Sequence, residues 1–423
     1  AWGDAVFLAY AQGGGIKVMS WWWLEGLGAL NDGALTPVEK MKLIPKAVRG
    51  MSPRDYEDIY TYVSNKQGWT PLMVFLYIHG GYKELWDKPH LQDKTLPRNL
   101  AAYMRESIDK GWIKVSPRED RTPKAYIFTG CNMLRRWPSP QIAKKHLWPK
   151  LDIIVGVNFK MTTSCMFADY VLPAAAYYEK VGIKYAVTYV PYVICSDKAT
   201  EPLGESKSEW EIFGRMSKMI SERAKARNIG PVRGWHDKPL DLTKVYEHHT
   251  DNGKFDPLDP EDPMRFMDEI FEKSPSVSAR TGREALDMGA VPVIASSRPG
   301  IINQNYADYD PKDTHWAHRD MIEKKSAWPT LTGRMQFYID HPWFIEGHES
   351  LPTHKEPPHF ESKLPLRIAG GHNRWSIHSI WRDVKLLLRL QRGQPACWMN
   401  PKDTEARGIK DGEMVKVFND HGA

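Results

Sequence analysis

The middle of the chain alternates short apolar runs with a helix-forming segment. Residues 125–128 and 152–157 are apolar runs that predict strands, and residues 139–147, which open on Ser-Pro, predict a helix between them. This order predicts a parallel pair of strands joined by a right-handed crossover. Ligands of such sheets lie beyond the carboxyl ends of the strands. The polar turns at residues 129–132 and 158–159 follow those ends and are therefore candidate binding loops.

The next segment, residues 162–179, carries the most specific pattern. It reads Thr-Thr-Ser-Cys-Met-Phe-Ala-Asp-Tyr-Val-Leu-Pro-Ala-Ala-Ala-Tyr-Tyr-Glu, with small and hydroxyl side chains where a polyanionic cofactor needs close approach to the backbone. Asp169 precedes a short apolar strand, Pro173 ends that strand, and Glu179 closes an Ala-rich turn. A lone Ala-Asp-Tyr-Val-Leu-Pro is more often a buried strand before a helix. The full run favours a cofactor-binding loop.

The segments on either side are less regular. Residues 16–20 predict a strand, and residues 54–64 predict a helix that begins after Ser-Pro. Three consecutive indoles, Trp21 to Trp23, cannot all face one core. One of them therefore lines a cavity or an interface, or two pack and a partner covers the third.

The carboxy-terminal pattern indicates a β-barrel. Residues 366–369 predict a strand that opens into a polar loop, and residues 385–392 form a basic amphipathic segment. Residues 400–417 contain Asn-Pro-x-Asp and Gly-Ile-x-Asp-Gly, which predict a turn, a short helix, a second turn and a strand.

Composition and charge exclude some classes of protein. A chain of 423 residues can hold two or three domains, and its hydrophobic content of 42% is ordinary for globular proteins. The net charge of +6 comes without a Lys/Arg run, so nucleic acid is not favoured as a partner. No apolar stretch approaches the roughly 18 residues of a membrane span, and no signal peptide is visible. The chain begins without Met, and we expect both ends to be cuts through a longer polypeptide.

The sequence assigns no metal ligand. Residues 251–262 resemble a calcium loop only superficially, because the later Glu ligand is absent. Glu247, His248 and His249 point about 100° apart on a helix and predict a solvated helix end. None of the four cysteines belongs to a Cys-x-x-Cys pair, so we expect free, mostly structural thiols. The cysteines are Cys131, Cys165, Cys195 and Cys397.

Three separated elements agree with one known family. Residues 128–132, residues 162–179 and residues 400–412 resemble, in order and spacing, the later half of the catalytic subunit of the dimethyl sulfoxide reductase superfamily of molybdenum enzymes. Residues 331–341 and 371–379 are similar to respiratory nitrate reductase α subunits. They are at least as similar to selenate, chlorate and perchlorate reductases and to dimethyl sulfide, ethylbenzene and steroid C25 dehydrogenases.

The resemblance implies an α/β fold: a Rossmann-like parallel-sheet domain followed by a truncated double-psi β-barrel-type cofactor-binding domain. Residues 1–115 would belong to the central substrate and cofactor domains. Residues 116–345 would form the dinucleotide-binding domain with a polar insertion, and residues 346–423 would begin the carboxy-terminal barrel.

The implied cofactor is molybdenum held by two molybdopterin guanine dinucleotides, with an iron–sulfur cluster and the molybdenum ligand in the part of the protein upstream. Gly130, Cys131 and Asn132 would form the turn against one dinucleotide, although this chain has Met133 where the family more often has Pro. Asn158 and Asp169 would contact the nucleotide end. A loop of imidazole, hydroxyl, indole and guanidinium groups would surround a pterin and its pyrophosphate. Its residues are His372, Arg374, Trp375, Ser376, His378 and Ser379.

The resemblance also implies partners and a reaction class. The expected partners are an iron–sulfur electron-transfer β subunit and a haem b γ subunit, with a periplasmic location favoured over the cytoplasmic face of the membrane. The indoles Trp21, Trp22 and Trp23, with Glu25 as the candidate base that takes the proton from an oxidised C–H, favour anaerobic hydroxylation of an apolar small molecule. The alternatives are an oxyanion reductase and a metal-free structural subunit of the same fold. A nucleotide enzyme of ordinary Rossmann type ranks last, because no Gly-x-Gly-x-x-Gly follows the first strand.

Overall fold

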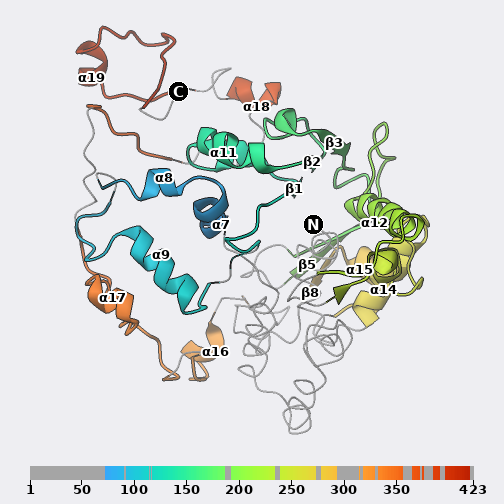
Figure 1. Ribbon diagram of the computed structural model, residues 1–423. Coiled ribbons are helices and arrows are strands. Elements are labelled where there is room, and N and C mark those ends of the chain that lie inside the picture. The colour runs from blue at the N-terminus through green and yellow to red at the C-terminus, as the bar shows by residue number, and fades with distance from the viewer. Residues whose placement is uncertain are drawn as a thin grey trace.

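The structure is a computed structural model, and it describes most of the chain after residue 71 (Figure 1). The described residues are 72–89, 92–113, 115, 117–185, 192–233, 239–272, 278–292, 314, 318–328, 332–355, 364–371, 374–375, 384–390 and 396–419. The strand predicted at residues 16–20 and the helix predicted at residues 54–64 lie outside this part.

A three-stranded parallel sheet forms the centre of the fold. Its strands are β1 (Ala125–Thr129), β2 (Ile153–Asn158) and β3 (Tyr170–Pro173), in the order β1-β2-β3. Helix α11 (Pro140–His146) connects β1 to β2 and begins after Ser139, which has a left-handed φ of 45°. The predicted strands, the helix between them and their parallel pairing are confirmed. The fold is therefore α/β with a parallel sheet.

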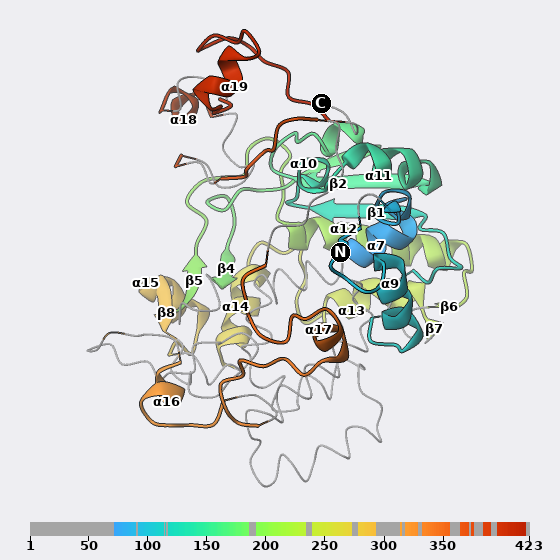
Figure 2. The same cartoon turned by 90° about the vertical axis from the view of Figure 1, so that its left-hand side faces the viewer.

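The two faces of this sheet pack against different helices. Phe128, Ile154 and Val171 point to one face, where they meet Leu147 at the end of α11 and Leu76 of α7 (Leu72–His79). Their neighbours along each strand point to the other face, because side chains alternate along a strand. There Val157 and Leu172 meet Phe213 of α12 (Glu209–Ala226). Figure 1 shows α7 and α11 on one side of the β1–β3 sheet and α12 on the other, and in Figure 2 the side with α7 and α11 faces the viewer.

One glycine lets the first face close. Gly156 lies between Phe128 of β1 and Val171 of β3 in the strand register. A Cβ atom at this position would lie 2.7 Å from Cζ of Phe128 and 3.3 Å from Sγ of Cys165. The distance to Phe128 is shorter than real Cβ contacts allow. The absence of a side chain therefore lets the ring and the thiol meet over β2.

A second sheet lies after the parallel one in the chain. It is antiparallel, with strands β4 (Gly182–Tyr185), β5 (Tyr192–Ser196) and β8 (Ala290–Pro292) in the order β4-β5-β8. Helices α14 (Asp262–Glu272) and α15 (Gly282–Met288) pack on it through a core that includes Phe271 and Val291. Cys195 of β5 is a buried free thiol, and its burial raises the pKa to about 12. Thus the predicted structural role of this cysteine is confirmed.

The remaining elements are short. The helices are α8 (Lys83–Trp86), α9 (Leu100–Asp109), α10 (Met133–Arg136), α13 (Val245–His249), α16 (Arg319–Ile322), α17 (Pro342–Glu346), α18 (Lys385–Leu390) and α19 (Pro401–Glu405). Single 3₁₀ turns cover Trp148–Lys150, Cys165–Phe167 and Leu242–Lys244, and β6 (Val232–Arg233) pairs with β7 (Pro239–Leu240). Among the described residues, no helix is long and apolar enough to cross a membrane.

Three sequence predictions require correction. Residues 366–369 and the end of residues 400–417 were predicted as strands, but the structure shows no strand at either place, and most apolar side chains there are exposed, with Ile368 at 80% and Met414 at 82%. A strand needs a partner for its backbone groups, and neither segment pairs with one among the described residues. The short helix predicted after Asn400 is confirmed as α19. His249 was predicted to be solvated, but it is buried beside α12 at 7% exposure, and burial lowers its pKa.

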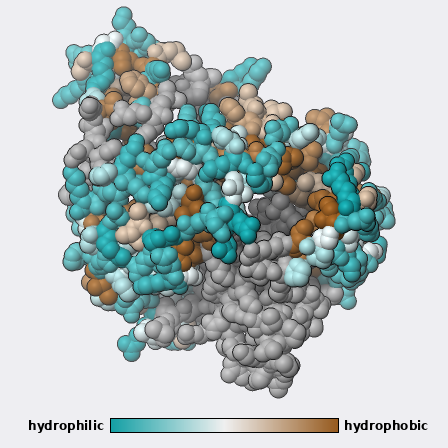
Figure 3. Space-filling view, in the orientation of Figure 1, coloured by the Kyte–Doolittle hydropathy of each residue, from teal (hydrophilic) through white to brown (hydrophobic). Residues whose placement is uncertain are grey.

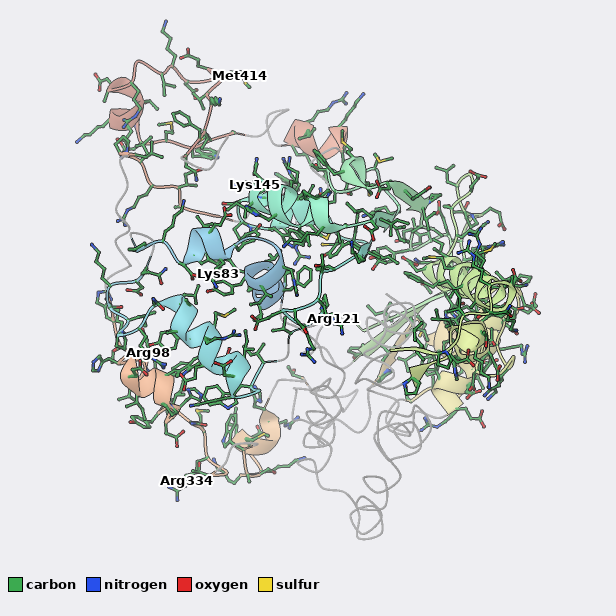
Figure 4. The ribbon with its side chains drawn as sticks, viewed as in Figure 1. Lys83, Arg98, Arg121, Lys145, Arg334 and Met414 are labelled. Atoms are coloured by element: carbon green, nitrogen blue, oxygen red, sulfur yellow. The ribbon has the colours of Figure 1, made fainter. Side chains whose placement is uncertain are left out.

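Helices α9 and α17, far apart in the sequence, are joined by an ion-pair and aromatic cluster that we call the α9–α17 contact. Arg98, labelled beside α17 in Figure 4, reaches both carboxylates of the cluster: Glu106 at 2.7 Å through Nη1 and Glu346 at 2.9 Å through Nη2. Trp343 donates its Nε1–H to Glu106 at 2.9 Å and packs edge-on against Tyr103. The contact anchors the segment after residue 332 on the helices before β1.

The α9–α17 contact should weaken in acid. Hydrogen bonds from Lys110, Arg98 and Trp343 lower the pKa of Glu106 to about 2, from an ordinary value near 4.5. A carboxyl group with a lowered folded-state pKa contributes stability above its unfolded pKa and loses it as the pH falls. Glu106→Gln should therefore lower the melting temperature at pH 6, and its difference from wild type should shrink between pH 4.5 and pH 2.

Thermal melts of both proteins across pH 2–6 measure this difference. Glu201→Gln is the control, because Glu201 is exposed and, among the described residues, its carboxylate pairs only with Lys198, three residues away. A difference between Glu106→Gln and wild type that stays constant down to pH 2 would contradict the prediction.

Candidate functional site

The loop after β1 begins with a glycine in a left-handed conformation. Gly130 has φ 56°, and its N–H donates to the carbonyl of Val157 at the end of β2, 3.0 Å away. A Cβ atom built on Gly130 would meet nothing within 4 Å, and the residue is exposed. An L-residue is strained at this φ, so glycine is required for the turn. The backbone of this loop is thereby open to a ligand.

The side chain of Asn132 ties this loop to the segment after β2. Its Oδ1 accepts two hydrogen bonds from Ser164, one from the backbone N at 3.2 Å and one from Oγ at 3.0 Å. Ser164 Oγ in turn accepts from the backbone N of Leu134 in α10, at 3.0 Å. Ser164 is completely buried. The loops that follow β1 and β2 are thus held together as one unit.

Asn158 ends β2 at the same edge of the sheet. The residue is buried, and its Oδ1 accepts from the backbone N of Lys160 at 3.3 Å. Its carbonyl accepts from the N of Ala174, just after β3, at 3.1 Å. The structure therefore brings together the predicted residues Gly130, Cys131, Asn132 and Asn158 at the carboxyl edge of the parallel sheet.

Asp169 lies at the opposite edge. Its Oδ2 accepts from the backbone N of Ile154 at 2.7 Å, and its own N donates to the carbonyl of Ile154 at 2.9 Å. Ile154 and Asn158 are four residues apart in β2, which corresponds to about 13 Å along a strand. The carboxylate of Asp169 thus aligns the start of β3 with β2. Its predicted contact with a nucleotide stays a prediction, and the contact would be at the amino edge.

The turn after β3 has the predicted closing residue. Glu179 Oε2 accepts from the backbone N of Ala176 at 2.7 Å, and the N of Glu179 donates to the carbonyl of Ala176 at 3.0 Å. At the beginning of the same run, Thr162 Oγ1 accepts from the backbone N of Cys165 at 3.3 Å. The interpretation of residues 162–179 as turn, strand and Glu-closed turn is confirmed.

Two residues of the predicted pterin loop belong to the described part. The guanidinium carbon of Arg374 lies 5.4 Å from the centre of the Trp375 ring, in a cation–π contact, and both side chains are exposed. His372, Ser376, His378 and Ser379 lie outside the described residues, as do Trp21, Trp22, Trp23 and Glu25. The roles predicted for all of these residues stay predictions.

The surroundings of the carboxyl edge suit an anionic ligand with flat rings. The chain has no carboxylate side chain between Asp120 and Asp152, and Arg135 and Arg136 follow the Gly130 loop with exposed side chains. Nη1 of Arg136 lies 3.5 Å from the sulfur of Cys131. Cations and an open glycine backbone fit a pyrophosphate group. The residues present therefore fit a dinucleotide at this edge.

Apolar side chains are exposed beside these polar groups. The ring of Phe159, which follows Asn158, lies 6.4 Å from the ring of Tyr177, and both are about half exposed. Met161 is 68% exposed and Tyr178 is 74% exposed. Figure 3 shows apolar surface near the position of the β1–β3 sheet. Flat apolar side chains at this edge could stack on a heterocyclic ring.

Ser164 is the functional candidate that the sequence analysis did not single out. Its hydroxyl belongs to the Thr-Thr-Ser-Cys run, which was interpreted only as small and polar. Its contact with Asn132, 32 residues earlier, depends on how the two loops meet in space. The sequence does place the amide of Asn132 after the first predicted strand and the hydroxyl of Ser164 after the second. Their separation along the chain does not by itself predict that they form a hydrogen bond.

Comparison with known proteins places this site in a family. Residues 101–219 match the family model described as "Molybdopterin oxidoreductase", and residues 366–423 match the one described as "Molydopterin dinucleotide binding domain". The first match includes the whole β1–β3 sheet and its carboxyl edge. These matches confirm the class of cofactor that the sequence predicted, a molybdopterin dinucleotide.

Curated relatives agree with both matches. The respiratory nitrate reductase subunit alpha of Haloferax mediterranei is 36% identical over 373 residues, which cover 85% of this chain and 36% of the relative. The perchlorate reductase subunit alpha of Dechloromonas aromatica is 30% identical, covering 84% of this chain and 36% of the relative. The dimethylsulfide dehydrogenase subunit alpha of Rhodovulum sulfidophilum is 29% identical, covering 81% of this chain and 37% of the relative.

The chain thus spans a little over a third of the length of these relatives. Among solved structures, acetylene hydratase from Pelobacter acetylenicus matches 69% of this chain and 33% of its own, with 17% identity and a TM-score of 0.43. From the two matched domains and the alpha-subunit relatives, the chain belongs to the molybdopterin oxidoreductase family.

Proposed function

We propose that this chain is the part of a molybdenum oxidoreductase catalytic subunit that holds a molybdopterin guanine dinucleotide, and that the whole protein reduces an oxyanion. The carboxyl edge of the β1–β3 sheet carries this proposal: an open left-handed Gly130, the linked Asn132 and Asn158 loops, and Arg135 and Arg136 with no carboxylate nearby in sequence. This edge lies within residues that match the molybdopterin oxidoreductase model.

The residues of this chain would bind and orient the cofactor. The Gly130 backbone would admit a phosphate group, and the asparagines would hydrogen-bond to the dinucleotide. Arg374, with Trp375 packed against it, would pair with a pyrophosphate from the second matched segment. When bound, the molybdenum cofactor supplies two-electron redox chemistry that these side chains cannot perform. The protein then contributes binding, orientation and exclusion of water.

The choice of an oxyanion departs from the apolar substrate that the sequence favoured. Two of the relatives described above are named as nitrate and perchlorate reductases, and none of the three is named for hydrocarbon hydroxylation. Hydroxylation of an apolar substrate is therefore not supported. The residues that suggested it, Trp21 to Trp23 and Glu25, lie outside the described part. A second candidate is oxidation of a sulfide, because one relative is named as a dimethylsulfide dehydrogenase.

The wider assembly follows as part of the same proposal. The relatives are named as alpha subunits, which supports partner subunits. We propose an iron–sulfur β subunit, a haem b γ subunit and an iron–sulfur cluster upstream in the catalytic subunit. A periplasmic location, the domain boundaries near residues 115 and 345 and a double-psi barrel that begins near residue 346 are retained as proposals.

The test of this function uses the full-length protein, matured in a host that makes the cofactor. We expect about one molybdenum atom and two guanine nucleotides per chain, by elemental analysis and by nucleotide release in acid. With a reduced viologen as electron donor, nitrate, chlorate, perchlorate or selenate should be reduced.

The same protein matured in a host without the cofactor is the control, and we expect it to be inactive. Loaded protein that oxidises dimethyl sulfide but reduces no oxyanion would favour the second candidate. Protein without molybdenum or guanine nucleotide would disprove both.

A further inference from the structure

The segment that connects β2 to β3 has an inverted pattern of burial. Residues 159–170 bury small side chains, since Ser164 and Cys165 are both inside the fold. Their large apolar side chains lie on the surface instead, with Met166 at 72% and Tyr170 at 62% exposure. We call the exposed apolar side chains of this segment the β2–β3 apolar surface. They are Phe159, Met161, Met166, Phe167 and Tyr170.

Hydrogen bonds hold the segment in this orientation. The backbone N of Met166 donates to the carbonyl of Thr162 at 3.0 Å, and Trp148 donates its Nε1–H to the carbonyl of Phe167 at 3.0 Å. On the inner side, the sulfur of Cys165 lies over Gly156 of β2. The large side chains are therefore directed outward by an ordered backbone. A contiguous apolar patch on an ordered segment is typical of an interaction surface.

The β2–β3 apolar surface extends from one edge of the sheet to the other. Phe159 follows Asn158 at the carboxyl edge, whereas Tyr170 is in register with Val155 of β2. Four residues of a strand separate these two levels, which corresponds to about 13 Å. A ligand at the carboxyl edge could cover Phe159 but would not reach Tyr170. Another protein surface is needed to cover the whole patch.

Cations border this surface. Nζ of Lys144 lies 4.4 Å from the centre of the Phe167 ring, and Lys160 belongs to the segment itself. The sequence has no Asp or Glu between residues 152 and 169. A complementary surface would therefore carry apolar side chains with carboxylates around them. Two copies of this chain would instead bring cations against cations, which opposes their association.

The rest of the catalytic subunit is the best candidate for the covering surface. This chain spans a little over a third of the length of its relatives, so most of a subunit of that size lies outside the 423 residues. A segment of the same polypeptide is held near the patch at an effective concentration on the order of millimolar, whereas a separate protein must bind from dilute solution. Coverage by the same polypeptide therefore has the lower entropic cost.

We propose that the β2–β3 apolar surface is an interface inside the catalytic subunit, covered by a portion of the same polypeptide that lies outside these 423 residues. That portion presents apolar side chains to Met166 and Phe167 and carboxylates to the neighbouring lysines. The inference rests on the proposed function in one respect, that this chain is part of a longer catalytic subunit.

Methionine oxidation tests this interface in the full-length catalytic subunit, purified without partner subunits and without cofactor. Dilute hydrogen peroxide converts accessible thioethers to sulfoxides, and peptide mass spectrometry gives the rate at each methionine. Met161 and Met166 should react at least about tenfold more slowly than in the same protein unfolded in urea. Met219, about half exposed on α12, is the comparison for an accessible methionine, and the buried Met267 is the slow reference.

Four results would overturn the proposal. Oxidation of Met161 and Met166 as fast as that of Met219 would show that nothing covers the patch. Protection that appears only after partner subunits are added would assign the surface to another chain, and protection that is lost on dilution would assign it to a second copy. Protection that requires bound cofactor would assign it to the ligand. Because the main measurement uses cofactor-free protein, failure of the proposed function through absence of nucleotide leaves this test intact.

A charged substitution provides a second measurement. Met166→Lys in the full-length subunit should lower the urea midpoint, because a covered ammonium group loses its hydration. Met219→Lys is the matched control and should keep the wild-type midpoint, since the same change is made at a side chain that stays in water. Met166→Leu retains an apolar side chain of similar volume and should also keep that midpoint.

The two lysine variants must differ for the proposal to stand. An unchanged midpoint in Met166→Lys, or an equal fall in Met219→Lys, would reject it. If Met166→Lys does not accumulate as folded protein, the oxidation rates of the wild-type subunit decide.

Discussion

Replacing Leu147 by Ala should lower the free energy of unfolding by about 2–5 kcal/mol. Leu147 is completely buried at the end of α11, in the core that joins this helix to β1, β2 and α7. Truncation removes apolar contacts and leaves a cavity, and the packed rings of Trp137 and Phe128 around it limit how far the core can collapse. Urea unfolding followed by hydrogen exchange of the β1 and β2 amides measures the loss.

Leu203→Ala is the matched control for this prediction. It makes the same chemical change at a side chain that is 82% exposed, so its effect should stay within about 0.5 kcal/mol. Equal effects of the two variants would show that the α11 core does not determine the stability of the sheet.

Phe213→Ala should be as damaging from the opposite face of the sheet, lowering the free energy of unfolding by about 3–5 kcal/mol. Phe213 is buried on α12, where it packs with Val157 of β2 and Ala174 after β3. Loss of the ring should loosen α12 from the sheet and, with it, the end of β2 that carries Asn158. Hydrogen exchange should therefore speed up in residues 153–158 and 209–226, and the urea midpoint should fall.

Phe337→Ala provides the comparison, because Phe337 is 66% exposed. Faster exchange confined to α12, with β2 unchanged, would contradict the view that this helix supports the carboxyl edge.

The parallel sheet could be predicted from the sequence, because the patterns that indicate its strands and connecting helix each lie within a few consecutive residues. Residues 125–128 and 152–157 are apolar on both faces, as buried parallel strands are, and Ser139-Pro140 marks the helix between them. The candidate binding loops could also be predicted, because the carboxyl ends of parallel strands meet at one edge. Asp169 precedes β3, as predicted, but the structure puts it at the amino edge of the sheet and Asn158 at the carboxyl edge.

The features that sequence reasoning missed depend on distant contacts. Strand β8 pairs with β5 although about a hundred residues separate them, and no local pattern announces such a partner. The burial of His249 depends in the same way on α12, because its imidazole lies beside Gly214 of that helix. The strands predicted at residues 366–369 and at the end of residues 400–417 have suitable local patterns, but a local pattern does not supply a partner strand.

The α9–α17 contact also has a consequence for the time course of synthesis. Trp343 bonds to Glu106 across 237 residues of chain. A ribosome that adds about 5–20 residues per second releases α9 roughly 10–50 s before α17. The β1–β3 sheet, complete at Pro173, emerges much sooner after α9 and can fold before this contact exists. Closure of α17 onto α9 is therefore a late event in the biogenesis of this chain, because the sheet can fold before α17 has been synthesised.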